Sequence, residues 1–296
     1  MNILLTGANG FLGSYIKMAF ADQNLTTLGL SDCDLNYNLA SGIPELKKSF
    51  NIVIHSAGKA HVIPRTTKEK EDFFATNVQG TRNLLNALEQ TKKLPKTFVF
   101  ISTVSVYGVE NAANFNETTP LHGETPYASS KIKAEKLLTD WGKQYQVNIL
   151  ILRLSLLVGE NPPGTLGNMM KAIRKGYYFR IGAGSARRSM ILASDVAQLI
   201  SKSHNKSGIY NLTDGYHPSF KELEESISQQ YGNRIRKIPF WLALVAAKIG
   251  DLFTFLPINS RLLDKISHSD TYNDDKARME LEWNPGKVLD FFVDNT

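Results

Sequence analysis

A tyrosine and a lysine stand four residues apart in the segment TPYASSK, residues 125–131. Thr125 followed by proline is typical of a helix start. Positions i and i+4 lie on one helix face, so the phenol of Tyr127 and the ammonium of Lys131 are expected side by side. A phenol has a pKa of about 10, and a neighbouring cation favours the phenolate and lowers that pKa. The pair could therefore act as a general acid or base, although an exposed polar helix start would show the same pattern.

A glycine-rich turn near the N-terminus could bind phosphate. In TGANGFLG, Gly7, Gly10 and Gly13 stand between an apolar run and a helical pattern. Glycine permits a tight turn and close approach of a pyrophosphate, whose charge the following helix N-terminus stabilises. The spacing is three and three, whereas the common dinucleotide fingerprint has two and three. We therefore expect a dinucleotide at this turn, and no metal site is predicted.

An alternation of strands and helices must position these residues. Apolar runs predict strands over residues 2–7, 25–30, 51–58, 97–108 and 148–159. Helical spacing of apolar residues predicts helices over residues 11–23, 73–93 and 126–145. The alternation predicts an α/β fold with a Rossmann-type doubly wound parallel sheet. Ligands of such sheets bind at the carboxyl ends of the strands, where the glycine turn and Tyr127 would both lie.

The alternation weakens in the second half of the chain, which predicts a smaller C-terminal α/β substrate domain. We expect residues 1–160 to form the dinucleotide-binding domain, with residues 187–215 returning to it. Residues 161–186 and 216–296 would supply the substrate pocket. Residues 238–258 are apolar but contain Lys248 and Asp251, which favours a buried amphipathic helix or helix pair over a membrane span. Contact with a membrane surface or another subunit is the alternative for this segment.

The composition narrows the partners and the compartment. The chain has 296 residues, 42% of them hydrophobic, and a formal charge of +6. Lysine and arginine are spread along the sequence, which argues against nucleic acid as a partner. The single cysteine, Cys33, excludes an intramolecular disulfide framework. The N-terminus lacks the pattern of a signal peptide, so a cytoplasmic location is expected.

Several further motifs resemble one family. They are HSAG at 55–58, NVQGT at 77–81, ISTVSVYG at 101–108, PYASSK at 126–131 and RRSMILASD at 187–195. Together with the glycine turn they span nearly the whole chain. They resemble the extended short-chain dehydrogenase/reductases of the NAD-dependent epimerase/dehydratase family. The resemblance implies an enzyme with NAD or NADP as cofactor and a UDP- or dTDP-linked nucleotide sugar as substrate.

The resemblance also implies roles for individual residues. Tyr127 would exchange a proton with the substrate oxygen, Lys131 would hold the nicotinamide ribose and tune the tyrosine, and Thr103 would hydrogen-bond the same oxygen. Ser102 is the alternative to Thr103 if the register shifts. The implied cofactor contacts are Gly7, Gly10, Phe11, Leu12, Gly13, Asp34, Leu35, Ser56, Ala57, Gly58, Asn77, Ser102, Tyr127 and Lys131. The implied substrate contacts are Ser105, Asn168 and Arg188, although Arg188 could instead form a surface ion pair.

Departures from the family pattern narrow the reaction. Dehydratases of the family carry an Asp–Glu pair directly after the threonine, where this chain has Val104 and Ser105. Water elimination is therefore not expected, and Cys33 cannot supply the Cys–His pair of the epimerase-reductases. The C-terminal half resembles bacterial polysaccharide-biosynthesis members, which favours reduction of a 4-keto-6-deoxy sugar. The alternatives are a UDP-sugar 4-epimerase with retained NAD and a non-catalytic dinucleotide-binding regulator.

Two further expectations follow from the same resemblance. Strand two ends without an acidic residue at Gly29 or Leu30, so the choice between NAD and NADP stays open, and Asp32 could still serve NAD. Many relatives form dimers through two long helices, which here would be residues 73–93 and 126–145. A homodimer is therefore expected.

Overall fold

The structure is a computed structural model that describes residues 1–60, 62–109, 111, 113–252 and 260–293. Its helices are α1 (Phe11–Ala19), α2 (Thr67–Phe74), α3 (Gly80–Glu89), α4 (Pro126–Tyr145), α5 (Gly164–Arg174), α6 (Ala193–Lys202), α7 (Phe220–Tyr231), α8 (Phe240–Leu252), α9 (Ser260–Ser267), α10 (Asp275–Leu281) and α11 (Asp290–Val293). Its strands are β1 (Asn2–Thr6), β2 (Asn24–Gly29), β3 (Leu35–Asn36), β4 (Ile52–His55), β5 (Thr97–Thr103), β6 (Asn148–Leu154), β7 (Leu156–Val158), β8 (Phe179–Ile181), β9 (Met190–Leu192), β10 (Gly208–Leu212) and β11 (Arg236–Ile238).

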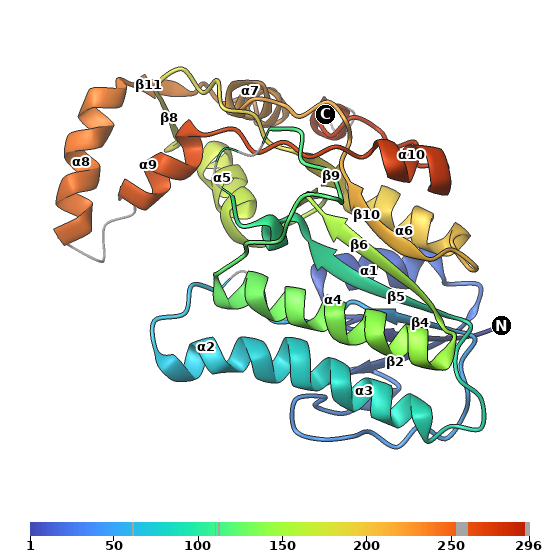
Figure 1. Cartoon of the computed structure of the whole chain (residues 1–296). Helices are drawn as coiled ribbons and strands as arrows, with labels where there is room; N and C mark the ends of the chain where they lie inside the picture. The colour runs from blue at the N-terminus through green and yellow to red at the C-terminus, as the bar shows by residue number, and fades with distance from the viewer. Residues whose placement is uncertain (61, 110, 112, 253–259, 294–296) are drawn as a thin grey trace.

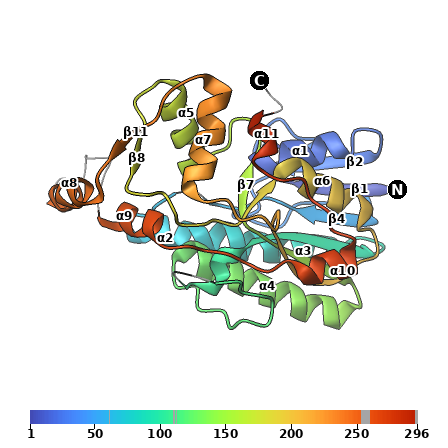
Figure 2. The ribbon, with the colours of Figure 1, turned by 90° about the horizontal axis from the view of Figure 1, so that it is seen from above.

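A seven-stranded sheet forms the centre, in the order β10-β6-β5-β4-β1-β2-β3, and every pairing in it is parallel. Parallel strands need helices on both faces, and their apolar runs are buried accordingly. One core lies between the sheet and helices α1 and α6, and a second lies between the sheet and helices α3 and α4 (Figures 1 and 2). The predicted Rossmann-type doubly wound fold is confirmed.

Three predicted boundaries were wrong for local reasons. The helix expected over 73–93 begins at Thr67, because Thr66 and Glu69 form a capping box, and it passes through a π-helical turn at 75–79 before ending at Glu89. The strand expected over 97–108 ends at Thr103, which caps a short 3-10 helix. The strand expected over 148–159 breaks at Ser155, and its second half pairs with β9 outside the main sheet.

The second half of the chain returns to the sheet once. Strand β10 pairs with β6 at the sheet edge, and α6 packs beside α1 on one face. Helices α5, α7 and α11 share a separate core. The division into two domains stays a prediction.

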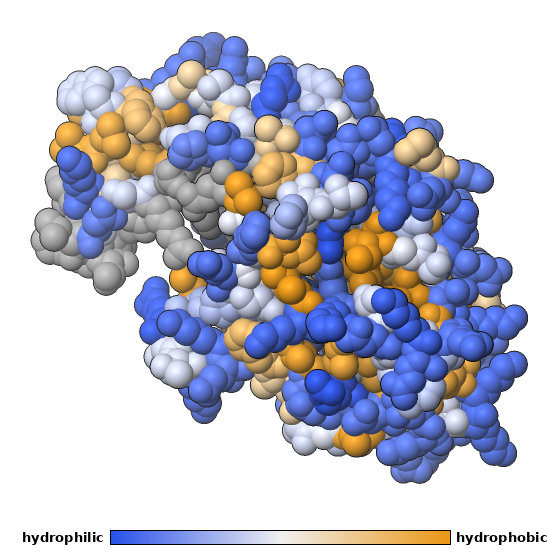
Figure 3. Space-filling model, in the orientation of Figure 1, coloured by the Kyte–Doolittle hydropathy of each residue, from blue (hydrophilic) through white to orange (hydrophobic). Residues whose placement is uncertain are grey.

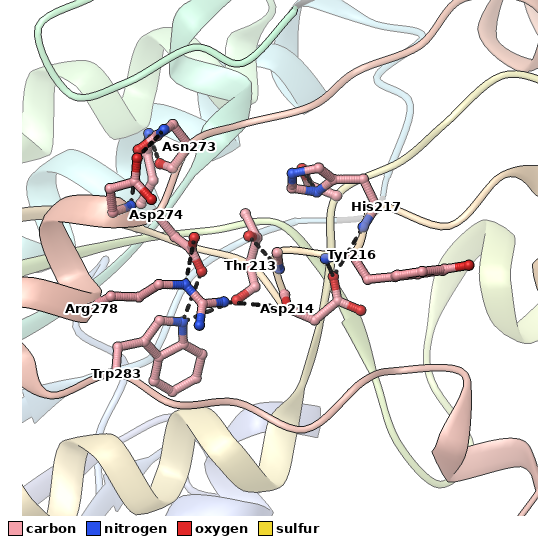
Figure 4. A network of polar contacts seen from close by, with 12 residues as sticks. Thr213, Asp214, Tyr216, His217, Asn273, Asp274, Arg278 and Trp283 are labelled. Atoms are coloured by element: carbon pink, nitrogen blue, oxygen red, sulfur yellow. Dashed lines mark hydrogen bonds and ion pairs between the residues drawn. The ribbon is translucent and has the colours of Figure 1, made fainter.

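A polar network ties the C-terminal segment to the end of β10 (Figure 4). Asp274 accepts hydrogen bonds from Arg278 Nε at 3.0 Å and from Trp283 Nε1 at 3.2 Å. The same indole nitrogen donates to the carbonyl of Thr213 at 3.0 Å, and the backbone N–H of Val288 donates to Asp214 at 3.1 Å. These bonds satisfy buried polar groups and fix α10 against the main sheet.

The apolar segment 238–258 forms α8, and its residues 253–258 lie outside the described part of the chain. The prediction of a buried amphipathic helix was wrong in one respect, because several large apolar side chains of α8 are exposed. No helix among the described residues is long and apolar enough to cross a membrane.

Candidate active site

Tyr127 lies in the first turn of α4, at the carboxyl end of the sheet. The helix begins as predicted, because the Thr125 hydroxyl accepts from the backbone N–H of Ala128 at 3.2 Å and Pro126 occupies the first helical position. The ring is half-buried, and its hydroxyl forms a hydrogen bond with Thr103 at the end of β5. Two segments far apart in the sequence thus bring two hydroxyls together where the family places its acid–base pair.

Thr103 and Ser102 point to different partners, although they are adjacent in β5. The Ser102 hydroxyl donates to Glu135 at 2.5 Å and is buried beneath the site. The Thr103 hydroxyl lies 3.2 Å from that of Ser105, and bonds Tyr127. Because strand side chains alternate between faces, only one of the two hydroxyls can face Tyr127. That hydroxyl belongs to Thr103.

Lys131 lies one helical turn after Tyr127 and is buried. Its ammonium donates to the carbonyl of Ile101 at 2.7 Å and lies 4.4 Å from the centre of the Phe100 ring. Burial lowers the pKa of Lys131 to about 8, and the nearby charge of Glu135 opposes that shift. The ammonium is therefore fixed below the site by the end of β5.

The expected lowering of the Tyr127 pKa depends on the Lys131 ammonium together with the positive ring of an oxidised nicotinamide, and it stays a prediction. Burial raises the pKa of Tyr127 to about 12, and only the hydrogen bond from Thr103 acts in the opposite direction. The Lys131 ammonium donates to the backbone carbonyl of Ile101. The phenol is thus protonated near neutral pH, and lowering its pKa requires a further positive charge at the site.

A buried ion pair under Lys131 escaped the sequence interpretation. Glu135 accepts from Arg153 Nη2 at 2.7 Å and from Ser102, and Arg153 Nη1 donates to the Tyr107 hydroxyl at 3.1 Å. Glu135 stands at i+8 from Tyr127 and i+4 from Lys131, so all three share one face of α4. That spacing was the available signal, and a buried carboxylate on this face needs a buried cation.

Asn77 holds the loop after β4 against α4. Its side-chain amide donates to Ser130 Oγ at 2.9 Å and to the carbonyl of Lys59 at 3.1 Å, and its oxygen accepts from the backbone N–H of Lys59 at 2.7 Å. A Cβ on Gly58 would lie 3.4 Å from Lys131 Nζ and 3.1 Å from Asn77 Oδ1. The predicted cofactor residues Ser56, Ala57, Gly58 and Asn77 therefore lie in one cluster next to the lysine.

The glycine turn leaves a cradle that other residues would fill. Gly7 has a φ of +74°, and a Cβ there would lie 2.6 Å from the backbone nitrogen of Ala57. A Cβ on Gly13 would overlap the carbonyl oxygen of Gly7, which holds α1 tightly against the turn. Phe11 and Leu12 begin α1, so the helix N-terminus faces the turn. These features fit a dinucleotide pyrophosphate.

Ser155 gives a second test of cofactor fit. Its hydroxyl is buried and has no hydrogen-bond partner among the described residues. Ser155 follows Leu154, the residue paired with Thr103 across β5 and β6, so it lies at the same sheet end as the acid–base pair. A buried hydroxyl without a partner is costly, and a polar group of a bound nicotinamide would satisfy it.

Asp34 and Leu35 follow β2. The Asp34 carboxylate accepts from the backbone N–H and the hydroxyl of Thr27, both at 2.8 Å, and these bonds lower its pKa. Leu35 opens β3 and pairs with Leu28. These residues shape the far edge of the expected adenosine site, and their contact with a cofactor stays a prediction.

The expected substrate residues come from three separate segments of the chain. Arg188 forms an ion pair with Asp270 and lies 5.7 Å from the centre of the Phe220 ring, and burial lowers its pKa. Asn168 is exposed in the second turn of α5, which begins at Gly164. Ser105 is exposed beside Thr103. Their contact with a substrate stays a prediction.

Comparisons with known proteins agree with this geometry. A profile of the NAD dependent epimerase/dehydratase family matches residues 3–213. The chain is 28% identical over 268 residues to the N-acetyl-alpha-D-glucosaminyl-diphospho-ditrans,octacis-undecaprenol 4-epimerase of Escherichia coli O157:H7, with 86% of this chain and 80% of that protein covered. It is 26% identical over 259 residues to the human dTDP-D-glucose 4,6-dehydratase, with 77% and 73% covered.

A solved structure shares the fold along almost the whole chain. The UDP-glucuronic acid 4-epimerase of Bacillus cereus, in complex with UDP-glucuronic acid and NAD, superposes with a TM-score of 0.76 at 19% identity, covering 99% of this chain and 97% of that one. The matched profile, the relatives and the Tyr127–Lys131 helix confirm the resemblance seen in the sequence: this chain belongs to the NAD dependent epimerase/dehydratase family.

Proposed function

We propose that this protein is an NAD(P)-dependent 4-epimerase of a diphosphate-linked hexose. The observation that carries the proposal is the Tyr127–Thr103 hydroxyl pair, fixed beside buried Lys131 at the carboxyl end of the sheet. A single hydroxyl pair can transfer a proton at the oxygen of one carbon, so the expected chemistry is the interconversion of an alcohol and a ketone at that carbon. A nicotinamide bound along the glycine turn would supply the hydride acceptor and donor for that exchange.

The protein groups divide the proton transfer between them. Tyr127, as the phenolate, would accept the C4 hydroxyl proton, and Thr103 would donate a hydrogen bond to the same oxygen. A bound nicotinamide would supply the acceptor and donor of the C4 hydride. Return of that hydride to the opposite face of the sugar, with return of the proton from Tyr127, would invert the carbon. The half-buried position limits water access, so the ketone is protected until it is reduced again.

The structure offers no support for dehydration. Val104 and Ser105 follow Thr103 where the dehydratases carry their Asp–Glu pair. Glu135, the buried carboxylate two turns after Tyr127 in α4, is held by Arg153 and Ser102. It is therefore unable to take up or release a proton at the sugar without breaking a buried ion pair.

The comparisons support the epimerase over the reductase that the sequence alone favoured. Two of the proteins compared above are named 4-epimerases, one acting on a diphospho-undecaprenol-linked sugar and one solved with UDP-glucuronic acid. The shared chemistry is a sugar diphosphate, and Arg188 would contact its phosphates because a guanidinium suits phosphate oxygens.

A 4-ketoreductase is the second candidate, and one observation favours it. Burial raises the pKa of Tyr127 to about 12, which favours the protonated phenol, and a protonated phenol is suited to donate a proton to a developing alkoxide. A reductase needs Tyr127 only to donate a proton to the substrate oxygen. An epimerase must also form the phenolate, which requires the positive ring of an oxidised nicotinamide.

A homodimer through α3 and α4 is part of the proposal. The two helices border a groove of about 300 Å³. Its lining combines the part-buried Leu137 and Tyr145 and the buried Leu85 and Trp141 with the polar residues Arg82, Asn86, Glu89, Asp140 and Gln144. Side chains of this kind on a helix pair suit a four-helix contact between two copies.

Cofactor retention separates the two activities. The purified protein is denatured and the released nicotinamide is quantified, and the native protein is then given UDP-N-acetylglucosamine without added cofactor. An epimerase releases NAD and forms the C4 epimer. Stoichiometric consumption of added NADH or NADPH with a dTDP-4-keto-6-deoxy sugar, and no epimer, would establish the reductase instead. Tyr127→Phe serves as the inactive control for both reactions.

A further inference from the structure

Helix α8 buries small residues and exposes large apolar ones, which is the opposite of an ordinary surface helix. The residues that face inward are small, namely Ala243, Ala247 and Gly250. The exposed apolar residues are large: Phe240 (42% exposed), Trp241 (64%), Leu242 (43%), Leu244 (41%) and Val245 (53%). A surface helix normally buries its large apolar side chains against the core. The outward face of α8 thus presents a contiguous apolar surface to its surroundings.

The position of α8 leaves that surface accessible. Helix α8 packs against α9 through a small cluster that includes Leu263 and Ile266, and Phe240 also lies beside Gly182. Figures 1 and 2 place α8 away from the main sheet, and Figure 3 shows hydrophobic residues gathered over it. Phe179, 43% exposed, lies on β8, which pairs with β11, the strand directly before α8. The exposed side chains of Phe240, Trp241, Leu242, Leu244 and Val245 are called the α8 face below.

Cations outnumber carboxylates beside the α8 face, where the one carboxylate of α8, Asp251 near its C-terminal end, accepts hydrogen bonds from Ser260. Residues 234–248 contain Arg234, Arg236, Lys237 and Lys248, all exposed, and no aspartate or glutamate. Arg236 and Lys237 lie on β11, directly before α8. Lys248 stands seven residues after Trp241 and four after Leu244, so it projects from the same side of the helix.

This charge pattern fits one kind of occupant better than the others. A two-fold contact with a second copy would bring identical cations together in an apolar interface, where like charges are costly. A bilayer that contains anionic phospholipid supplies the opposite charge, and its headgroup region accommodates tryptophan and extended lysine side chains. At 13 residues, α8 is too short to cross the hydrocarbon core, which fits a helix lying on the surface.

We propose that the α8 face docks this protein on an anionic phospholipid surface. Phe240, Trp241, Leu244 and Val245 enter the headgroup boundary, and Lys248 contacts lipid phosphates together with whichever of Arg236 and Lys237 lies on that side of β11. Strand β1 starts at the far side of the molecule, so α8 lies beyond the carboxyl end of the sheet in both ribbon views (Figures 1 and 2). A docked molecule therefore holds the end of the sheet that carries Tyr127 on the lipid side. The inference does not depend on the proposed 4-epimerase activity.

Vesicle co-sedimentation of the full chain tests this proposal. We expect the protein to sediment with vesicles of equimolar phosphatidylcholine and phosphatidylglycerol, and to remain largely free with phosphatidylcholine alone. The double variant Trp241→Ser/Leu244→Ser should bind roughly tenfold or more weakly, because it removes the apolar contact. The double variant Arg236→Glu/Lys237→Glu should lose at least roughly tenfold, and high salt should weaken the wild type.

A matched control uses exposed apolar residues elsewhere. Met18 and Leu30 are 75% and 76% exposed, so Met18→Ser/Leu30→Ser removes apolar surface outside the α8 face and should leave binding unchanged. Thermal unfolding of each variant shows whether it is folded. Failure of the wild type to sediment with phosphatidylglycerol vesicles would overturn the proposal. So would a solution dimer that Trp241→Ser/Leu244→Ser dissociates in the absence of vesicle binding, since that result assigns the face to a second copy.

Discussion

Helix α4 carries charged side chains on the face that points into the protein, whereas α8 carries large apolar side chains on the face that points out of it. Both depart from the usual amphipathic pattern. In α4 the buried Lys131 and Glu135 are satisfied by Ile101 and Arg153, so the cost of burial is offset by specific bonds. In α8 the exposed apolar side chains have no comparable partners within the described residues. We therefore associate the buried charges of α4 with the active site. We associate the exposed apolar side chains of α8 with a contact to a partner outside the chain.

Removal of the Tyr127 hydroxyl is the largest expected break in the α4 arrangement. Tyr127→Phe keeps the ring and its neighbour Phe73 but removes the proton donor. We expect kcat/KM to fall about 100- to 10,000-fold, the range for loss of a general acid or base. Cofactor binding, followed by fluorescence, should persist. The control Tyr145→Phe changes a tyrosine at the other end of α4 and should keep full activity; equal losses in both variants would refute the assignment.

Replacement of Glu135 tests whether the stability of the fold depends on its buried ion pair with Arg153. Glu135→Leu leaves Arg153 buried without its counter-charge, and we expect the free energy of unfolding to fall by about 3–5 kcal/mol in urea titrations. Lys136 lies on the exposed side of the same helix, paired with Asp140. Lys136→Ala should change that free energy by less than about 0.5 kcal/mol. Similar urea midpoints for Glu135→Leu and wild type would show that the pair is not needed.

Thr103 and Ser102 separate a reacting hydroxyl from a structural one. Thr103→Val keeps the shape but removes the hydrogen bond to the substrate oxygen, so kcat should fall about 100-fold with little change in unfolding. Ser102→Ala removes a bond to Glu135, which should cost about 1 kcal/mol of stability and leave kcat within a few-fold. The opposite pattern in steady-state kinetics would favour Ser102 as the reacting hydroxyl.

His55 is a buried polar group that stabilises the fold only when neutral. Its ring nitrogens bond the hydroxyls of Thr6 at 2.6 Å and Thr81 at 2.9 Å, and burial lowers its pKa from 6.5 to about 3. As the pH falls below 6.5, the unfolded chain takes up a proton that the native state does not, so stability is lost towards pH 3. Between pH 6.5 and 5 the loss should be about 1.5 kcal/mol.

The variant His55→Gln checks that pH dependence. It keeps a hydrogen-bonding side chain but does not titrate, so its free energy of unfolding should change less over the same pH interval. Chemical denaturation at a series of pH values measures both proteins. Equal pH slopes in wild type and variant would show that His55 does not carry the effect.

The contrast between the two helices also explains which features the sequence could predict. The glycine turn, the order of strands and the start of α4 follow from local signals, namely apolar runs, a cap and a four-residue spacing. The ion pair of Glu135 was missed because Glu135 lies on α4 and its partner Arg153 lies on β6, and the spacing within α4 gives no sign of which residue pairs with it across the fold. The break at Ser155 is set by strand β9, which is distant in sequence. For α8, an apolar composition fits a buried helix and an exposed one equally, so only the surrounding chain decides which face is covered.

Transfer of the C4 hydrogen tests the central claim most directly. The protein as purified, without added cofactor, is incubated with UDP-N-acetylglucosamine carrying deuterium at C4, and the product is examined by NMR. A 4-epimerase takes the deuterium from C4 and returns it to the same carbon, so the account predicts the inverted sugar with deuterium retained at C4 and no exchange with water. Loss of the deuterium from the sugar into free cofactor, or no inversion by a protein that reduces 4-keto sugars with NAD(P)H, would contradict it.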